Sequence, residues 1–270
     1  MKTILITGCS SGFGLETARY FLDRDWKVIA TMRAPQPALL PASKRLRLLT
    51  LDVTDPASIR EAVELAGPID ALVNNAGVGL LSVLEGTPMS AVRALFEANT
   101  FGAIAVTQAF LPQLRERRSG VIVNVSSTVT LKALPMLSAY TASKAALNAF
   151  TESLALELEP FQVRARLVLP GQALVTPFGQ NAQALMETEG VTVPEPYSDL
   201  ARSVFERITG GGLSSLSTSP LDVAKAIWTA VSDPDCPLRQ PAGADAVELM
   251  NSSKVESGRS VHHRPSEAIL

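Results

Sequence analysis

A β-branched run at Thr3–Thr7 leads directly into a glycine-rich segment, Gly8-Cys9-Ser10-Ser11-Gly12-Phe13-Gly14. Apolar residues then recur at helical spacing, which predicts an amphipathic helix. A strand, a glycine turn and a helix in this order aim backbone N–H groups and a helix N-terminus at one point, where phosphate binds. Glycine is needed wherever φ is positive or a Cβ would keep a pyrophosphate away. We therefore predict that this segment binds the phosphates of a nucleotide.

Five further apolar runs suit buried strands, and a sixth, short run is a candidate last strand. They are Lys27–Thr31, Leu46–Leu51, Ile69–Val73, Val121–Val125, Val163–Leu169 and Ala246–Met250. Helical patterns alternate with them, and several begin with a capping residue and a proline, as at Asp55-Pro56. Strands joined by helices require right-handed crossovers and a parallel sheet covered on both faces. The sequence thus predicts an α/β fold, a Rossmann-like doubly wound sheet of about seven strands with helices on both faces.

The residues after the second predicted strand bear on the choice of nucleotide. In a dinucleotide-binding fold the residue about 20 positions past the glycines contacts the adenosine ribose. A carboxylate there bonds the 2′-hydroxyl, whereas an arginine pairs with a 2′-phosphate. Met32 and Arg33 follow the strand, and no carboxylate stands there. We therefore predict NADP(H) in preference to NAD(H).

Polar residues gather at the ends of two other predicted strands. Asn74-Asn75-Ala76-Gly77 follows the fourth, and Ser126-Ser127 follows the fifth. Because ligands bind outside the carboxyl ends of parallel strands, both segments are expected at one crevice. Asn99, near the start of an apolar helical segment, is a structural asparagine on chemistry alone.

Tyr140 and Lys144 stand four residues apart in a predicted helix that reaches Glu159. This spacing places them on one face. A phenol beside an ammonium can donate and accept a proton, and the cation is expected to lower the pKa of Tyr140 from about 10 toward working pH. The pattern predicts general acid/base chemistry on an oxygen.

Residues 172–219 are rich in Gly, Pro, Ser and Thr and contain two weakly amphipathic pieces, Phe178–Thr188 and Tyr197–Ile208. Such a segment over a binding edge is usually a substrate lid. We interpret residues 1–250 as one domain with 172–219 as its lid, and residues 251–270 as a C-terminal tail. The tail holds His262 and His263, which point to opposite sides, so no metal site is predicted.

Charge and cysteine content exclude other classes of protein. With 24 Lys and Arg against 26 Asp and Glu, the chain has no basic surface for nucleic acid or a membrane. No apolar run approaches the ~20 residues of a membrane span. Two cysteines make no disulfide framework. We therefore expect a cytoplasmic protein.

Together, these motifs resemble the classical short-chain dehydrogenases/reductases (SDR) over essentially residues 1–250. Thr7 and the glycine segment are similar to the family's cofactor loop, and Pro170-Gly171 to its motif after the sixth strand. The resemblance implies a catalytic tetrad of Asn99, Ser127, Tyr140 and Lys144. It also implies cofactor contacts from Gly8, Ser10, Ser11, Gly12, Phe13, Gly14, Arg33, Asp52, Val53, Asn75, Ala76, Gly77, Tyr140, Lys144, Pro170, Gly171 and Thr176.

The resemblance also bears on individual roles. It selects Ser127 over Ser126 and gives Asn99 a relay role through a water next to Lys144. Lys144 would lower the Tyr140 pKa and bond the nicotinamide ribose. Thr176 stands five residues after Gly171, one further than in the family pattern.

The function implied is NADP(H)-dependent interconversion of a ketone or aldehyde and an alcohol, with Tyr140 as the acid/base. Apolar candidates for the pocket wall favour a lipophilic substrate; they are Val78, Leu131, Leu134, Met136 and Phe178. The expected partner is a small carbonyl or alcohol, and the resemblance implies a homodimer or homotetramer through the helices near Asn99 and Tyr140. Alternatives on the same scaffold are an epimerase or dehydratase, and a non-catalytic NADP-binding regulatory protein.

Overall fold

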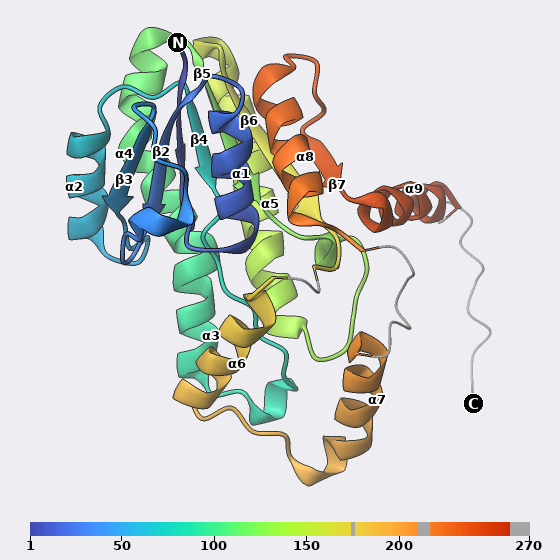
Figure 1. Cartoon of the computed structure of the whole chain (residues 1–270). Coiled ribbons are helices and arrows are strands. Elements are labelled where there is room, and N and C mark those ends of the chain that lie inside the picture. Colours follow the sequence, from blue (N-terminus) through green and yellow to red (C-terminus); the bar gives the residue numbers. More distant parts are fainter. Residues whose placement is uncertain (174–175, 210–216, 260–270) are drawn as a thin grey trace.

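The computed structural model describes residues 1–173, 176–209 and 217–259 (Figure 1). Its strands form one sheet in the order β3-β2-β1-β4-β5-β6-β7, and every neighbouring pair is parallel. The strands are β1 (Thr3–Ile6), β2 (Lys27–Met32), β3 (Leu46–Thr50), β4 (Ala71–Asn74), β5 (Gly120–Val125), β6 (Val163–Pro170) and β7 (Arg239–Ala242). The doubly wound parallel sheet predicted from the sequence is confirmed.

The α-helices occupy the connections between strands and the C-terminal part of the described chain. They are α1 (Gly12–Leu22), α2 (Pro56–Ala66), α3 (Met89–Phe96), α4 (Gly102–Arg117), α5 (Ser138–Leu158), α6 (Phe178–Thr188), α7 (Ser198–Thr209), α8 (Pro220–Ser232) and α9 (Ala244–Arg259). Short helical turns lie at η1 (Pro37–Leu39), η2 (Leu84–Gly86), η3 (Glu97–Phe101), η4 (Thr128–Thr130), η5 (Glu159–Phe161) and η6 (Glu195–Tyr197). No helix among these described residues is long and apolar enough to cross a membrane.

The sheet separates two apolar cores because alternate strand residues point to opposite faces. Ile4 packs with Phe21 of α1 and Ile227 of α8 on one face. Leu5 packs with Phe110 of α4 and Leu154 of α5 on the other, where α2 also lies. The helices therefore cover both faces and leave the carboxyl ends of the strands open to α6 and α7, which lie beyond that edge (Figure 1).

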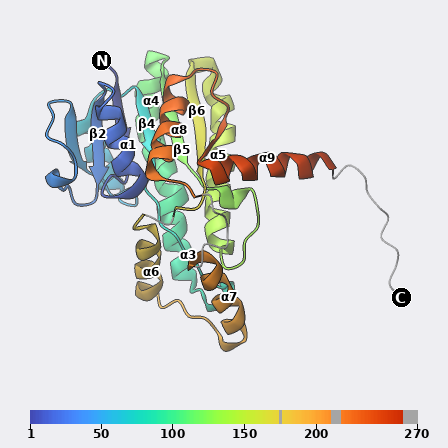
Figure 2. The same ribbon diagram turned by 45° about the vertical axis from the view of Figure 1, so that its right-hand side comes forward.

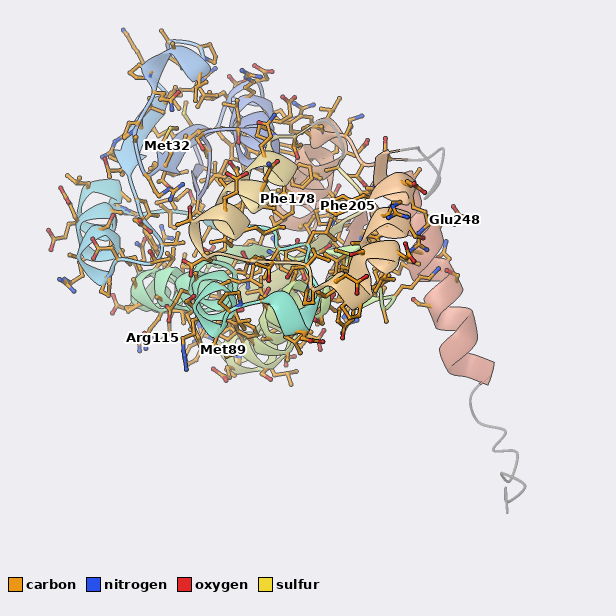
Figure 3. The ribbon with its side chains drawn as sticks, turned by 90° about the horizontal axis from the view of Figure 1, so that it is seen from below. Met32, Met89, Arg115, Phe178, Phe205 and Glu248 are labelled. Carbon is orange, nitrogen blue, oxygen red and sulfur yellow. The ribbon has the colours of Figure 1, made fainter. Side chains whose placement is uncertain are left out.

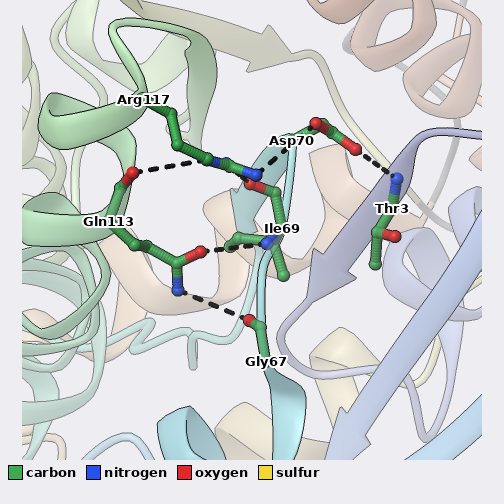
Figure 4. Close-up of polar contacts among 6 residues, drawn as sticks. All are labelled: Thr3, Gly67, Ile69, Asp70, Gln113 and Arg117. Carbon is green, nitrogen blue, oxygen red and sulfur yellow. Dashed lines mark hydrogen bonds and ion pairs between the residues drawn. The ribbon is translucent and has the colours of Figure 1, made fainter.

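A polar network fastens the opposite edge of the sheet (Figure 4). The Asp70 carboxylate accepts a hydrogen bond from the Thr3 N–H at 2.7 Å and pairs with Arg117 at 3.8 Å. Gln113 of α4 accepts a hydrogen bond from the Ile69 N–H at 3.0 Å, and Arg117 donates to the Ile69 carbonyl. This edge is thus fixed by side chains of the helix that packs on it, far from the open carboxyl ends.

The last strand and the C-terminal tail differ from the sequence prediction. Residues 246–250 belong to α9, because the buried pair Ala246 and Met250 is spaced by one helical turn. The seventh strand is β7, which among the described strands pairs only with β6; it holds Arg, Gln and Pro, so it carries no apolar run. Helix α9 crosses the predicted boundary at residue 250 and extends from the body (Figure 2). His262 and His263 lie outside the described residues.

Candidate active site

The glycine segment forms the turn between β1 and α1. Gly8 and Gly12 have φ of +73° and +54°, the left-handed region that favours glycine. A Cβ on Gly14 would lie 2.3 Å from the Gly8 carbonyl oxygen, so the turn can be this tight only with glycine there. Ser11 precedes α1 without a side-chain cap, which leaves the first N–H groups of the helix open to an anion. Ser10, Ser11 and Phe13 line the adjoining cavity with Gly8 and Gly12, whereas Gly14, predicted to contact the cofactor, is buried and does not line it.

The Asn-Asn-Ala-Gly segment ties the end of β4 to the end of β1. The Thr7 hydroxyl accepts hydrogen bonds from the N–H groups of Asn75 and Ala76 at 3.0 and 2.9 Å. The Asn75 amide donates to the carbonyls of Thr7 and Gly8 at 2.9 and 3.2 Å. Asn75 therefore anchors the phosphate turn to the end of β4. It also lines the cavity together with Ala76 and Gly77.

Arg33 lies at one end of the cavity, where the adenosine is expected to bind. Met32 before it is buried at the end of β2, whereas Arg33 is exposed and lines the cavity with Asp52 and Val53. Burial raises the pKa of Asp52, but hydrogen bonds from Thr54 and the charge of Arg33 outweigh it and hold the pKa below its usual value. A guanidinium is thus available here, with one carboxylate close to it.

Helix α5 places Tyr140 and Lys144 in the cavity wall, both buried. The Lys144 ammonium donates a hydrogen bond to the Val125 carbonyl at the end of β5 at 3.0 Å. Ser127, two residues after that strand, forms a side-chain hydrogen bond with Tyr140. Ser126 instead donates to the Lys144 backbone carbonyl at 3.5 Å. Of the two serines, Ser127 is therefore the one that contacts the phenol.

Burial controls the titration of this pair. It raises the pKa of Tyr140 to about 12, although the hydrogen bond with Ser127 lowers it. It lowers the pKa of Lys144 to about 8. The prediction that Lys144 pulls the Tyr140 pKa toward working pH is wrong for this structure, because desolvation of the phenol outweighs the other influences. At neutral pH the phenol keeps its proton and can give it.

Asn99 lies in η3, a π-helical turn that joins α3 to α4. Single π turns inside helices are frequent at functional sites. Its Oδ1 accepts a hydrogen bond from the Val78 N–H at 2.8 Å, and its Nδ2 donates to the Val78 carbonyl at 2.9 Å. A Cβ on Gly77 would lie 2.8 Å from Asn99 Oδ1 and 3.5 Å from Lys144 Nζ. Asn99 thus fixes the backbone next to Lys144; the water relay stays a prediction.

Pro170 ends β6 and Gly171 follows it; both line the cavity, as does Thr176. A Cβ on Gly12 would lie 3.5 Å from the Thr176 Cβ, which places Thr176 against the phosphate turn. The extra residue between Gly171 and Thr176 therefore does not carry this threonine away from the cofactor side of the cavity.

One cavity of about 1590 Å³ runs along the carboxyl edge of the sheet from the phosphate turn to α9. Beyond Tyr140 its walls are mainly apolar and include Val78, Leu80, Leu134, Phe178, Leu185 and Leu249. The Phe178 ring meets the Tyr140 ring edge-on with centroids 5.9 Å apart. In the view onto this edge, Phe178 lies between Met32 of β2 and Glu248 of α9 (Figure 3). Leu131 and Met136 were expected in the wall but pack in separate apolar clusters.

Sequence reasoning missed two contributions to this cavity. A Cβ on Gly79 would lie 2.7 Å from the Phe178 ring, so glycine there allows α6 to approach. Glu248, Leu249 and Ser252 of α9 also line the cavity, although they fall in or beside the predicted tail. The i, i+4 spacing of Ala246 and Met250 was the signal that could have revealed α9. Among the described residues no group of three or more His, Cys, Asp or Glu side chains could hold a metal.

An α/β fold with an open phosphate turn and a buried Tyr-Ser-Lys group defines a dinucleotide-dependent class of enzyme. Residues 2–187 match the family model described as short chain dehydrogenase. The chain is 34% identical over 285 residues to retinol dehydrogenase 8 of Homo sapiens, covering 100% of this chain and 90% of that protein. It is 36% identical over 256 residues to 17-beta-hydroxysteroid dehydrogenase type 1 of Homo sapiens, covering 87% and 76%.

Comparison with solved structures agrees with this family match. A short-chain dehydrogenase from Streptomyces avermitilis is 32% identical, with a TM-score of 0.79 over 96% of this chain and 94% of that one. Other structures of similar fold hold NADP or NAD. The chain belongs to the short-chain dehydrogenase family and is an oxidoreductase of that family.

Proposed function

We propose that this protein is an NADP(H)-dependent oxidoreductase that interconverts a lipophilic ketone or aldehyde and its alcohol. The observation that carries the proposal is the buried Tyr140, hydrogen-bonded to Ser127 and one helical turn from Lys144, in the wall of the cavity that begins at the phosphate turn. The two curated relatives named above carry retinol and a hydroxysteroid in their names, and both substrate types are lipophilic alcohols.

The residues present fit a dinucleotide. The glycine turn leaves space that a Cβ would fill, and the uncapped start of α1 offers N–H groups to the pyrophosphate. Arg33 would pair with a 2′-phosphate, which supports NADP(H) over NAD(H). Asp52 and Val53 would flank the adenine, while Gly171 and Thr176, which line the same cavity, would contact the rest of the cofactor. When bound, the nicotinamide supplies or accepts the hydride.

The chain's own residues act on the substrate oxygen. Tyr140 holds its proton at neutral pH and donates it to that oxygen as negative charge develops. Ser127 adds a hydrogen bond to the same oxygen, which stabilises that charge. Lys144 keeps a positive charge near the phenol. Its ammonium group can also donate a hydrogen bond to a hydroxyl of the cofactor ribose. A protonated phenol is the form of Tyr140 that carbonyl reduction requires, because it has the proton to give.

The apolar walls beyond Tyr140 exclude water and favour a lipophilic substrate. Phe178 next to the phenol and Leu134, Leu185 and Leu249 further along would contact a chain or ring system attached to the carbonyl. We therefore propose retinoid- or steroid-like carbonyl compounds as the substrate class.

The test is NADPH oxidation by the purified protein with a retinal, a 17-ketosteroid, a long-chain aldehyde and a small hydrophilic ketone. We expect stoichiometric NADPH oxidation, fastest with a lipophilic compound. Tyr140→Phe should bind NADPH as the wild type does and lose roughly 10²–10⁴-fold in turnover. Substrate conversion without net NADPH oxidation would instead indicate an epimerase or dehydratase. NADPH binding with no conversion of any compound would indicate a regulatory protein.

We also propose that the protein forms a homo-oligomer and acts in the cytoplasm. Phe101 in η3 and Leu156 of α5 are 52% and 72% exposed, and both belong to the long helical segments expected at the interface. Cys9 and Cys236 are both free, which supports a reducing compartment. Light scattering after size-exclusion chromatography checks the first proposal, and fluorescence microscopy of the tagged protein checks the second.

A further inference from the structure

The two ends of the 172–219 segment meet at one carboxylate, that of Asp245 in the first turn of α9. Asp245 Oδ2 accepts a hydrogen bond from the Gln172 N–H at 2.7 Å. Asp245 Oδ1 accepts one from the Thr218 hydroxyl at 2.7 Å. The Thr218 N–H in turn donates to the Gln172 carbonyl at 2.9 Å. Gln172 and Thr218, at opposite ends of the 172–219 segment, are therefore joined through Asp245, which lies outside that segment.

The Thr218 hydroxyl is the centre of this contact. It accepts a hydrogen bond from the Gly171 N–H at 3.0 Å, across 47 residues of sequence. Its own hydrogen can go to Asp245 or to the Ala242 carbonyl, which is 2.9 Å away. Thr218 is 1% exposed, so water cannot replace these partners. Loss of the hydroxyl would remove the donor to Asp245 Oδ1 and leave the Gly171 N–H only its longer hydrogen bond to the Ala242 carbonyl, at 3.3 Å, which is costly in this partly buried place.

Two glycines leave room for the pair. A Cβ on Gly171 would lie 2.0 Å from Asp245 Oδ2, and a Cβ on Gly243 would lie 2.1 Å from the Thr218 hydroxyl oxygen. Gly243 also has φ of +99°, which strains any other residue. The backbone of β6 and β7 thus closes directly around the carboxylate and the hydroxyl. We call Asp245, Thr218 and the groups that they bind the clasp.

The clasp adjoins the substrate part of the cavity. Gly171 and Gln172 line the cavity, and the chain continues from them to Thr176 and to α6, which carries Phe178 to the Tyr140 ring. On the other side, α9 starts at the clasp and contributes Leu249 to the cavity wall. A shift at the clasp would therefore move both walls relative to Tyr140.

We propose that Asp245 and Thr218 are positioning residues for the carbonyl substrate. They hold the start of the 172–219 segment, its end and α9 in one arrangement, and so make α9 part of the substrate site. The proposal rests on the proposed function for the identity of the ligand, while the arrangement itself can be tested without turnover.

The test compares Thr218→Val, which keeps the shape and removes the hydroxyl, with Thr218→Ser, which keeps the hydroxyl. Thr229→Val is the matched control, because that hydroxyl bonds within α8, to the Lys225 carbonyl. Three quantities are measured on the full chain: the KM for the best carbonyl substrate, the Kd for NADPH by fluorescence, and the rate of tryptic cleavage after Arg202 and Arg207 in α7.

For Thr218→Val we expect a KM raised by roughly 10-fold, since a hydrogen bond to a charged partner is lost. We expect faster cleavage in α7 and an NADPH Kd close to that of the wild type. Thr218→Ser and Thr229→Val should resemble the wild type in all three. Should Thr218→Val not fold, Asp245→Asn replaces it, because the amide keeps the Gln172 bond and loses the charge; a smaller rise in KM is then expected.

Equal KM and equal cleavage in the Val and Ser variants would overturn the proposal. A higher Kd for NADPH with an unchanged KM for the carbonyl substrate would also overturn it, because the clasp would then position the cofactor and not the substrate. If the wild type converts no carbonyl compound, the proposed function fails. The cleavage comparison then still decides whether the clasp holds the segment.

Discussion

Asn148 of α5 donates a hydrogen bond to the Thr130 hydroxyl at 3.0 Å, one turn beyond Lys144 on the same helix. Thr130 in turn donates to the Ser127 carbonyl at 2.8 Å. Tyr140, Lys144 and Asn148 are spaced by four residues each, so one helical face carries all three. The turn that holds Ser127 is therefore fastened by the helix that holds the phenol.

Asn148→Ala should lower kcat by roughly 10-fold and leave the NADPH Kd unchanged, because only the position of Ser127 changes. The Ser127 bond lowers the Tyr140 pKa, so the basic limb of the pH–rate profile should also move to higher pH. Stability should change little, because the buried Asn148 Oδ1 has no hydrogen-bond partner in the part of the chain that the structure describes, and its removal offsets the lost bond to Thr130. Thr130→Ser is the control that keeps the hydroxyl. An unchanged kcat and pH profile in Asn148→Ala would contradict the link.

The adjacent serines provide a matched pair. Ser127→Ala removes the hydroxyl that contacts the phenol, whereas Ser126→Ala removes one that bonds only the Lys144 backbone carbonyl. We expect a loss of roughly 10²–10³-fold in kcat for Ser127→Ala, the range for one donor to a developing oxyanion. Ser126→Ala should stay within a few-fold of the wild type. Steady-state kinetics with one carbonyl substrate decides, and the reverse order would reassign the serine.

Cofactor preference should depend on one exposed side chain. Arg33→Ala removes the guanidinium that would pair with a 2′-phosphate, so the ratio of kcat/KM for NADPH over NADH should fall by roughly 10- to 100-fold. Arg60→Ala, an exposed arginine on α2, is the control. The loss should lie in NADPH binding and leave NADH kinetics nearly unchanged. If the ratio in Arg33→Ala equals that of the wild type, the preference has another origin.

Burial of Lys144 makes stability depend on pH. Its pKa falls from an ordinary 10.5 to about 8 in the folded protein, so between these values the unfolded chain binds more protons. The contribution of Lys144 to the free energy of unfolding therefore rises with pH across that window, by up to roughly 3 kcal/mol. The Tyr140 pKa is raised, so its contribution falls with pH, but only above 10.

Urea unfolding at about pH 7 and about pH 9.5 measures this effect. The wild type should gain stability relative to Lys144→Met as the pH rises, because the variant has no ammonium to desolvate. Lys225→Met, on the exposed side of α8, is the control for loss of a lysine at the surface. Parallel pH dependence in the wild type and Lys144→Met would show that Lys144 is not desolvated in the fold.

Local patterns in the sequence were sufficient to predict most of the fold. Six strands begin or end within two residues of their predicted positions, because a continuous apolar run marks a parallel strand that is buried on both faces, and a period-3.6 pattern marks the buried side of a helix. β7 escaped prediction because an edge strand with Arg, Gln and Pro has no such pattern. The predictions for the glycine turn, Arg33 and the Tyr140–Lys144 pair also came from the sequence, since each depends on residue type and short spacing.

Tertiary structure decided what depends on residues far apart in the chain. The Tyr140 pKa of about 12 follows from burial among several elements, which no spacing on α5 reveals. The clasp joins Gly171, Thr218 and Asp245, and α9 becomes a wall of the cavity only because β7 places it there. The proposed chemistry at the substrate oxygen thus follows from the sequence, whereas the strength of the acid and the shape of the substrate site arise from desolvation and long-range packing.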